Sequence, residues 1–206
     1  MIQKERREPA RRGRPRAYEP ETALQRAFEA FWNAGYTGTS LDEIAAATGM
    51  NRPSLYAAFG DKHALYLKAL EHYWQRSFFA MQALKDAGLA LDEALMQAYD
   101  AQLSIYFSGD GEPRGCFAIG TATAEAVEHP EIRSSLVEGL RTLDAELEAR
   151  LRRAHVAGEL KGNADPAALA AIASATLHSL AIRARAGVPR AELREFARKA
   201  VSVICG

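Results

Sequence analysis

The sequence predicts an all-α protein of about nine helices, with a compact helix-turn-helix head at the N-terminus and a larger helical body. Apolar residues recur at helical spacing along almost the whole chain of 206 residues, and no segment alternates as a strand would. Capping residues and glycines mark where helices start and stop. At 48% hydrophobic and 25% charged residues, the composition is that of a soluble globular protein. No apolar run approaches the length of a membrane span.

The first predicted helix covers residues 20–34 and ends at Gly35. The second, 41–48, begins with a capping box, in which the Ser40 hydroxyl accepts the backbone N–H of Glu43 and the Glu43 carboxylate accepts that of Ser40. The inward stripe of the first helix consists of Leu24, Ala27, Phe28 and Phe31.

The third predicted helix, 52–59, follows Asn51 as its cap and carries Pro53 in its first turn, where a missing N–H is harmless. Asp61 caps a longer fourth helix. Glycines and prolines separate the remaining helices, which are expected at about 90–108, 115–128, 131–157, 166–186 and 190–204.

The charge is unevenly distributed, although 26 basic and 26 acidic residues give a net charge of zero. Residues 1–16 hold seven Lys and Arg against Glu5 and Glu8, which is +5 and leaves −5 for the rest. A basic arm on a mildly acidic body suggests a polyanionic partner for the arm. The alternative is a solvated tail that aids solubility.

Helices 41–48 and 52–59, joined by a tight turn at Gly49, form a candidate helix-turn-helix. The first residues of its second helix would meet base edges in the major groove of DNA. The Arg52 guanidinium can bind guanine, the Ser54 hydroxyl can donate or accept a hydrogen bond, and Pro53 can contact a thymine methyl. An ordinary helical hairpin is the alternative. Candidate phosphate contacts are Thr39, Ser40 at the start of helix 41–48, Tyr56 and Lys62.

A specific run supports the DNA-binding alternative. It contains Thr39-Ser40, Ile44-Ala45, Gly49, Leu55-Tyr56, Phe59, Lys62 and Leu65. This run resembles the DNA-binding domain of the TetR (tetracycline-repressor-like, TetR/AcrR) family of bacterial transcription regulators, over about residues 20–70. The sequence departs from the family pattern at Met50, where Val is usual, and at Ala57-Ala58, where larger side chains are common.

With only two cysteines and no secretion signal, a cytoplasmic location is expected. The resemblance implies a homodimeric repressor, released from a palindromic double-stranded DNA operator when a small molecule binds. It divides the chain into an arm (1–17), a DNA-binding domain (18–63) and a ligand-binding and dimerisation domain (64–206). Expected dimer contacts are Leu169, Ile172, Ala175, Ile182, Phe196, Ala200 and Ile204. Expected pocket residues are Trp74, Phe78, Met81, Met96, Tyr99, Tyr106, Cys116, Phe117, Thr121 and His178. Without clustered charges among them, an apolar or aromatic ligand is the default, and a regulator that needs no ligand is the alternative.

The arm contains Arg12-Gly13-Arg14-Pro15-Arg16, which matches the core of an AT-hook, an element that lies in the minor groove of A·T tracts. Glycine clears the groove floor, proline keeps the backbone extended, and Arg14 and Arg16 can follow the narrow, negative groove. Loose attraction to phosphates is the alternative.

Cys116 is one of two cysteines and is expected in the first turn of helix 115–128, beside Arg114. A helix N-terminus and an adjacent cation would lower the pKa of its thiol, as a redox- or electrophile-responsive regulator requires. The alternative is a small core residue. An enzyme is not expected, because no catalytic motif accompanies Cys116, His155 and His178. The five histidines show no metal-ligand spacing, so neither a metal nor a cofactor is expected.

Overall fold

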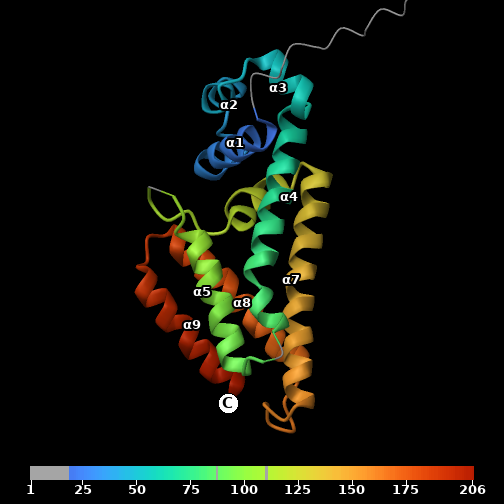
Figure 1. Ribbon diagram of the computed structural model, residues 1–206, viewed down its shortest axis with the longest axis vertical. Coiled ribbons are helices and arrows are strands. Elements are labelled where there is room, and N and C mark those ends of the chain that lie inside the picture. Colours follow the sequence, from blue (N-terminus) through green and yellow to red (C-terminus); the bar gives the residue numbers. More distant parts are fainter. Residues whose placement is uncertain (1–18, 87, 110) are drawn as a thin grey trace, which may run out of the picture.

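The computed structural model describes residues 19–86, 88–109 and 111–206, and these form helices and loops without a strand (Figure 1). The head contains α1 (Pro20–Ala34), α2 (Leu41–Thr48) and α3 (Arg52–Phe59). The predicted all-α class is thus confirmed. The body contains α4 (Lys62–Ala80), the 3₁₀ turn η1 (Gln82–Lys85), α5 (Leu91–Tyr106), the π-helical turn η2 (Ala118–Ala122), α6 (Thr123–Glu125), α7 (Pro130–Val156), α8 (Pro166–Arg185) and α9 (Arg190–Cys205).

Local capping sets the bounds of the head helices as predicted. Both bonds of the Ser40–Glu43 capping box are present. The Asn51 side chain accepts the Ser54 backbone N–H at 2.9 Å, and Asp61 accepts that of Ala64 at 2.8 Å. Each cap satisfies a backbone donor that has no partner within its helix.

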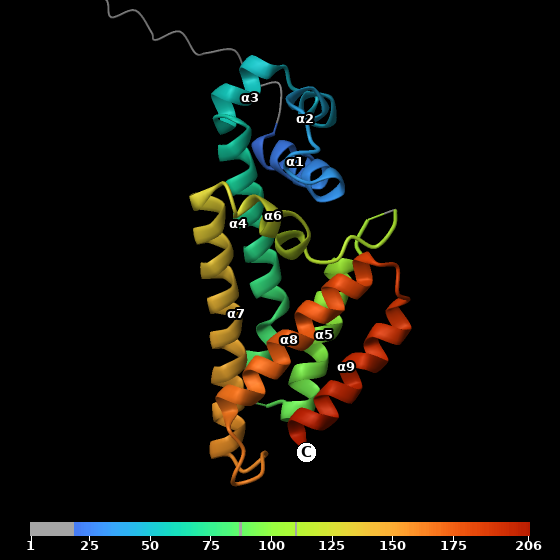
Figure 2. The same cartoon turned by 180° about the vertical axis from the view of Figure 1, so that it is seen from behind.

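Helix α4 joins the head to the body: it starts beside α3 and continues downward next to α7 (Figure 1). Helix α9 packs against α5 and α8, and the view from behind shows α8 crossing between α7 and α9 (Figure 2). One hydrophobic cluster runs from the head into the body. At its centre, Phe28 and Trp32 of α1 meet Tyr73 of α4 and Phe117. The head therefore rests on the body through a buried aromatic contact.

The predicted helix 115–128 is wrong in its regularity. The chain becomes helical only at Phe117 and passes through the π-helical turn η2 before the short α6. Gly115 has φ 67°, and a Cβ there would lie 2.3 Å from the carbonyl oxygen of Ala181 in α8. This close approach to α8 requires glycine in a left-handed conformation, which an α-helix does not allow.

Among the described residues, one helix, α8, is long and apolar enough to cross a membrane by length and composition. It packs in the body against α5, α7, α9 and η2. Its apolar composition is that of a bundle's core helix.

Candidate DNA-binding site and its connection to the body

The turn between α2 and α3 is built as the sequence predicts. Gly49 adopts a left-handed conformation, with φ 70° and ψ 16°. Next to it, the Thr48 hydroxyl donates to the Ile44 carbonyl at 2.7 Å and accepts the Met50 backbone N–H at 3.3 Å. These bonds end α2 abruptly and direct the chain into α3.

Helix α3 has one buried and one exposed face. Leu55 and Phe59 are buried in the head. Ser54 is half-buried, and the exposed residues at and after the start of the helix are Arg52, Pro53, Tyr56 and Ala57. The residues that were predicted to read bases therefore lie together at the N-terminal end of α3.

Arg52 is paired with Asp42 of α2. Its Nε donates to Asp42 Oδ1 at 2.8 Å and its Nη2 to Oδ2 at 2.6 Å. Both side chains are more than half exposed. The hydrogen bonds and charge of Arg52 lower the pKa of the Asp42 carboxyl. The sequence reasoning missed this pair, although the residues are only ten apart.

The expected phosphate contacts differ in their exposure. Tyr56 is exposed, whereas the half-buried Lys62 places its ammonium 4.4 Å from the centre of the Tyr36 ring. Burial lowers the pKa of Lys62. The Ser40 backbone N–H donates to the Glu43 carboxylate at 2.6 Å, so this donor already has an acceptor within the head.

The expectation for Thr39 is wrong, and the physical reason is burial. Its side chain is 1% exposed, and its hydroxyl donates to the Gly35 carbonyl at 2.6 Å. Thr39 therefore holds the α1–α2 connection together and does not offer its hydroxyl to a phosphate. Arg14 and Arg16 of the predicted minor-groove arm lie outside the described residues.

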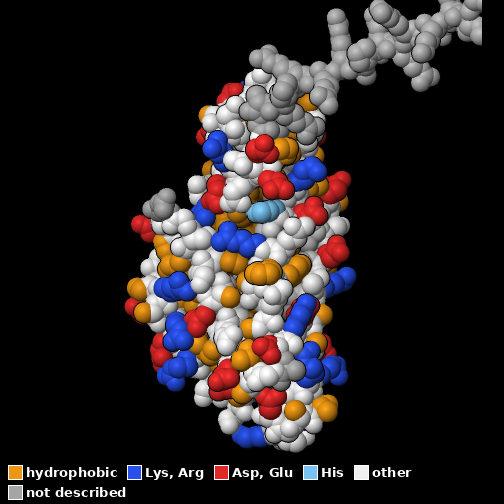
Figure 3. Space-filling view, in the orientation of Figure 1, with side chains coloured by type: hydrophobic (Ala, Val, Ile, Leu, Met, Phe, Trp, Pro, Cys, Tyr) orange, Lys and Arg blue, Asp and Glu red, His pale blue; other side chains and the backbone are white. Residues whose placement is uncertain are grey.

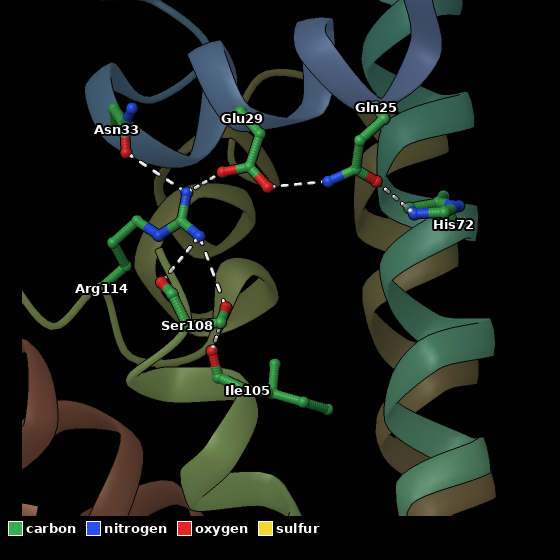
Figure 4. Close-up of polar contacts among 7 residues, drawn as sticks. All are labelled: Gln25, Glu29, Asn33, His72, Ile105, Ser108 and Arg114. Atoms are coloured by element: carbon green, nitrogen blue, oxygen red, sulfur yellow. Dashed lines mark hydrogen bonds and ion pairs between the residues drawn. The ribbon is translucent and has the colours of Figure 1, made fainter. Parts of the chain in front are cut away.

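Arg114, from the loop between α5 and η2, connects the body to α1 (Figure 4). Its side chain is 12% exposed and forms an ion pair with Glu29. Its Nη2 donates to the Ser108 carbonyl at 2.9 Å, and its guanidinium carbon lies 4.2 Å from the centre of the Trp32 ring. Its Nη1 also donates to Asn33 Oδ1 at 3.4 Å, so one cation from the body is held by three side chains of α1.

The same contact continues across α1 to α4. The Gln25 amide donates to Glu29 at 2.7 Å, and the Gln25 carbonyl lies 3.0 Å from His72 Nε2 (Figure 4). A polar chain from Ser108 to His72 therefore spans the underside of the head. A cleft of about 750 Å³ beside it is lined by Glu29, Trp32, Asn33, Gly109, Gly111, Glu112, Pro113, Arg114 and Arg185.

The predicted pocket residues do not line one shared cavity. Trp74 and Phe78 stack with ring centres 5.6 Å apart and line a groove of about 430 Å³ between α4 and α7. Cys116 lines a separate groove of about 340 Å³ beside α8. Four others are fully buried in the core: Met81, Tyr99, Tyr106 and Phe117. Thr121 is also buried, bonded to Tyr66 at 2.6 Å, whereas Met96 and His178 are half-buried.

The expected lowering of the Cys116 pKa is wrong. Arg114 points away toward Glu29. Cys116 does lie at the start of the helix, where its Sγ accepts the Ile119 backbone N–H at 3.4 Å. Burial raises the pKa of the Cys116 thiol, although Tyr73 donates a hydrogen bond to its Sγ at 2.9 Å. Burial disfavours the charged thiolate more than this bond stabilises it.

The predicted dimer residues fall into three groups. Ile172, Ala175, Ile182 and Phe196 are exposed. Leu169 and Ala200 are half-buried. The expectation for Ile204 is wrong, because this residue is 2% exposed and belongs to the core of its own chain. Helix α9 turns that position inward toward the body.

Comparisons with known proteins agree with this geometry. Residues 23–69 match the family model for bacterial regulatory proteins of the tetR family, and residues 93–200 match the tetracyclin repressor-like C-terminal domain. The chain is 30% identical to the HTH-type transcriptional repressor ComR of Escherichia coli, over 90% of this chain and 89% of ComR.

Two further similarities concern the DNA-binding end and the whole fold. Over 61 residues, which are 30% of this chain and 31% of the relative, the chain is 43% identical to the HTH-type transcriptional repressor BdcR of E. coli. The structure of the TetR family regulator CifR, a cysteine mutant in complex with 26-bp operator DNA, matches with a TM-score of 0.78 and 33% identity, covering 92% and 98% of the two chains.

The head and its turn define a helix-turn-helix transcription regulator. The chain belongs to the TetR family of these regulators. Its relatives are regulators of transcription.

Proposed function

We propose that the protein is a cytoplasmic repressor that binds a palindromic operator as a homodimer and leaves it when a small molecule binds the body. The exposed N-terminal end of α3, with Arg52, Pro53 and Tyr56, carries the proposal. An exposed recognition-helix start offers donors and apolar atoms to the major groove. Elsewhere the charges are mixed: Figure 3 shows acidic and basic side chains interspersed over the face that it views.

Selection of bound sequences from random DNA tests the DNA-binding proposal. Wild-type protein should enrich two inverted half-sites, one for each α3 of the dimer. Arg52→Ala should lower affinity and relax the preference at one position in each half-site, because a bidentate guanine contact is worth about 1–3 kcal/mol. An unchanged preference at every position in Arg52→Ala would remove Arg52 as a base reader.

Exposed apolar residues on α8 support the homodimer. Ile172 and Ile182 are 45% and 58% exposed, and Ala175 lies between them in the sequence. Ile182→Glu should shift the protein toward monomer, measured by light scattering during gel filtration. Val156→Glu, at an exposed position on α7, is the control and should leave the dimer intact. Equal masses for both variants and the wild type would contradict the assignment of α8.

The groove between α4 and α7 supports an apolar or aromatic effector. It places the stacked rings of Trp74 and Phe78 beside Gly139 and Thr142. Addition of aromatic compounds should quench or shift Trp fluorescence and release the selected operator together. Trp74→Leu should abolish release by a compound that acts through this groove. Release that persists unchanged in Trp74→Leu would place the effector elsewhere.

A second candidate signal is covalent modification of Cys116. Its position at the groove beside α8, next to Ala181 and Arg185, favours this alternative, whereas its raised pKa opposes it. The test is operator release by an enone or mild peroxide in a Cys205→Ser background. Release that disappears in Cys116→Ser supports a sensor, and equal release by both proteins rejects it.

The basic arm is proposed to add contacts in the minor groove. Deletion of residues 1–16 should flatten the salt dependence of binding, by about 0.9 in slope for each lost phosphate contact. Minor-groove reading further requires that an A·T preference at the operator flanks is lost on deletion. An unchanged flank preference would leave only non-specific attraction.

A further inference from the structure

The pair between Arg52 and Asp42 uses only one edge of the guanidinium. Nε and one Nη2 hydrogen face the two carboxylate oxygens, at 2.8 and 2.6 Å. A guanidinium has five N–H donors in one plane. The two hydrogens of Nη1 and the second hydrogen of Nη2 therefore remain for another partner. The outer edge, formed by Nη1 and Nη2, can still contact guanine O6 and N7 together.

The Arg52–Asp42 pair also lies at the end of α3 that is proposed to contact the bases. Arg52 is the first residue of α3, and Asp42 lies in the first turn of α2, so their pairing bridges the two helices of the motif. Both side chains are solvent-exposed, at 54% for Arg52 and 74% for Asp42. Exposed ion pairs contribute little to folding. A role in recognition accounts for the pair better than a role in stability.

We propose that Asp42 is a specificity-determining residue that acts through Arg52, by holding the guanidinium edge-on so that its outer edge meets guanine. The inference rests on the proposed reading of DNA by α3. Asp42 is a positioning residue here, since it contacts Arg52 and not the base.

Two physical effects give Asp42 its influence on specificity. A held arginine has already lost much of the rotamer freedom that it would otherwise lose on binding, so its contact with the correct base gains about 2- to 10-fold. A carboxylate near the phosphates also weakens binding to every sequence through charge repulsion. Asp42 therefore favours the correct site and disfavours all the others.

The test compares four proteins: wild type, Asp42→Asn, Arg52→Ala and the double variant. Random-DNA selection gives the base preference at each position, and fluorescence anisotropy gives affinities for the selected operator and its single-base variants. Asp42→Asn should lower the preference for guanine by about 2- to 10-fold at the position that Arg52→Ala relaxes. It should also strengthen binding to unrelated DNA. In the Arg52→Ala background, Asp42→Asn should change no base preference further.

Glu21→Gln is the matched control, because it removes one exposed carboxylate from the first turn of α1 in the same head. It should leave all base preferences as in the wild type. Thermal unfolding of each variant checks that the head is folded, and Asp42→Asn is expected to melt within about 2 °C of the wild type.

Three outcomes would overturn the proposal. Asp42→Asn could leave the guanine preference unchanged. It could instead change the base preference at a different position, and this second outcome would indicate that Asp42 itself contacts a base amino group. It could also change base preference equally with and without Arg52. If wild-type protein enriches no inverted site at all, the proposed operator binding fails instead, and this result is distinct from the other three.

Discussion

Replacing Arg114 by Met should loosen the head from the body. Met keeps most of the apolar length of the side chain but removes its charge and its donors. The main lost contacts are the ion pair with Glu29, the bond to the Ser108 carbonyl and the contact with the Trp32 ring; two longer bonds, of 3.4 Å, to Asn33 and the Ser108 hydroxyl are lost as well. Because the Arg114 side chain is only 12% exposed, water replaces few of these contacts.

The expected cost is about 2–3 kcal/mol of unfolding free energy. Hydrogen bonds that involve a charged group contribute about 1.5–3 kcal/mol, and a cation over an aromatic ring contributes about 0.5–1 kcal/mol. Glu29 is 37% exposed and regains water when its partner is lost, which reduces the ion-pair share. At about 2–4 °C per kcal/mol for a chain of this size, the melting temperature should fall by roughly 4–12 °C.

Urea unfolding of Arg114→Met, Glu29→Gln and the double variant measures the coupling. We expect the double variant to be at least about 1 kcal/mol more stable than the sum of the single losses predicts. Arg152→Met is the control, since Arg152 is 65% exposed and pairs with Glu148 within α7; it should cost under about 0.5 kcal/mol. Additive losses for Arg114 and Glu29, or equal losses for Arg114 and Arg152, would refute the reasoning.

Three further predictions concern single side chains. Tyr56→Phe should weaken binding to all DNA sequences alike, by about 5-fold, because a phosphate contact carries no base information; a changed base preference in selected DNA would contradict this. Gly139→Ala should lower the unfolding free energy measured in urea by up to about 2 kcal/mol, because the new Cβ would lie 2.1 Å from the Trp74 indole. In a Trp74→Leu background the same substitution should be neutral or stabilising, since alanine favours the helix. Burial raises the pKa of Cys205 to about 11, so at pH 7.5 its alkylation by iodoacetamide should be slower than that of a free cysteine by about 100-fold or more. The alkylation rate, followed by mass spectrometry, should rise until about pH 11. A plateau near about pH 9 would show that the pKa shift is absent.

The helices of the head follow from the sequence because their determinants are local. The Ser40–Glu43 box, the Asn51 cap and the turn at Gly49 each depend on residues within four positions of one another. Such interactions form whatever the rest of the chain does. Part of the exposed surface of α3 is predictable for the same reason, since a helix with Leu55 and Phe59 buried turns Pro53 and Ala57 outward. Arg52 is exposed because it is the first residue of the helix.

Contacts between residues far apart in the sequence were decided by the tertiary structure alone. The approach of Gly115 to α8 interrupts the expected helix and buries Cys116, which reverses the expected direction of its pKa shift. The ion pair of Arg114 with Glu29 joins residues 85 positions apart, and periodicity along one helix does not specify which charges meet. Spacing and capping determine which face of a helix is apolar, but only packing in three dimensions determines what covers that face.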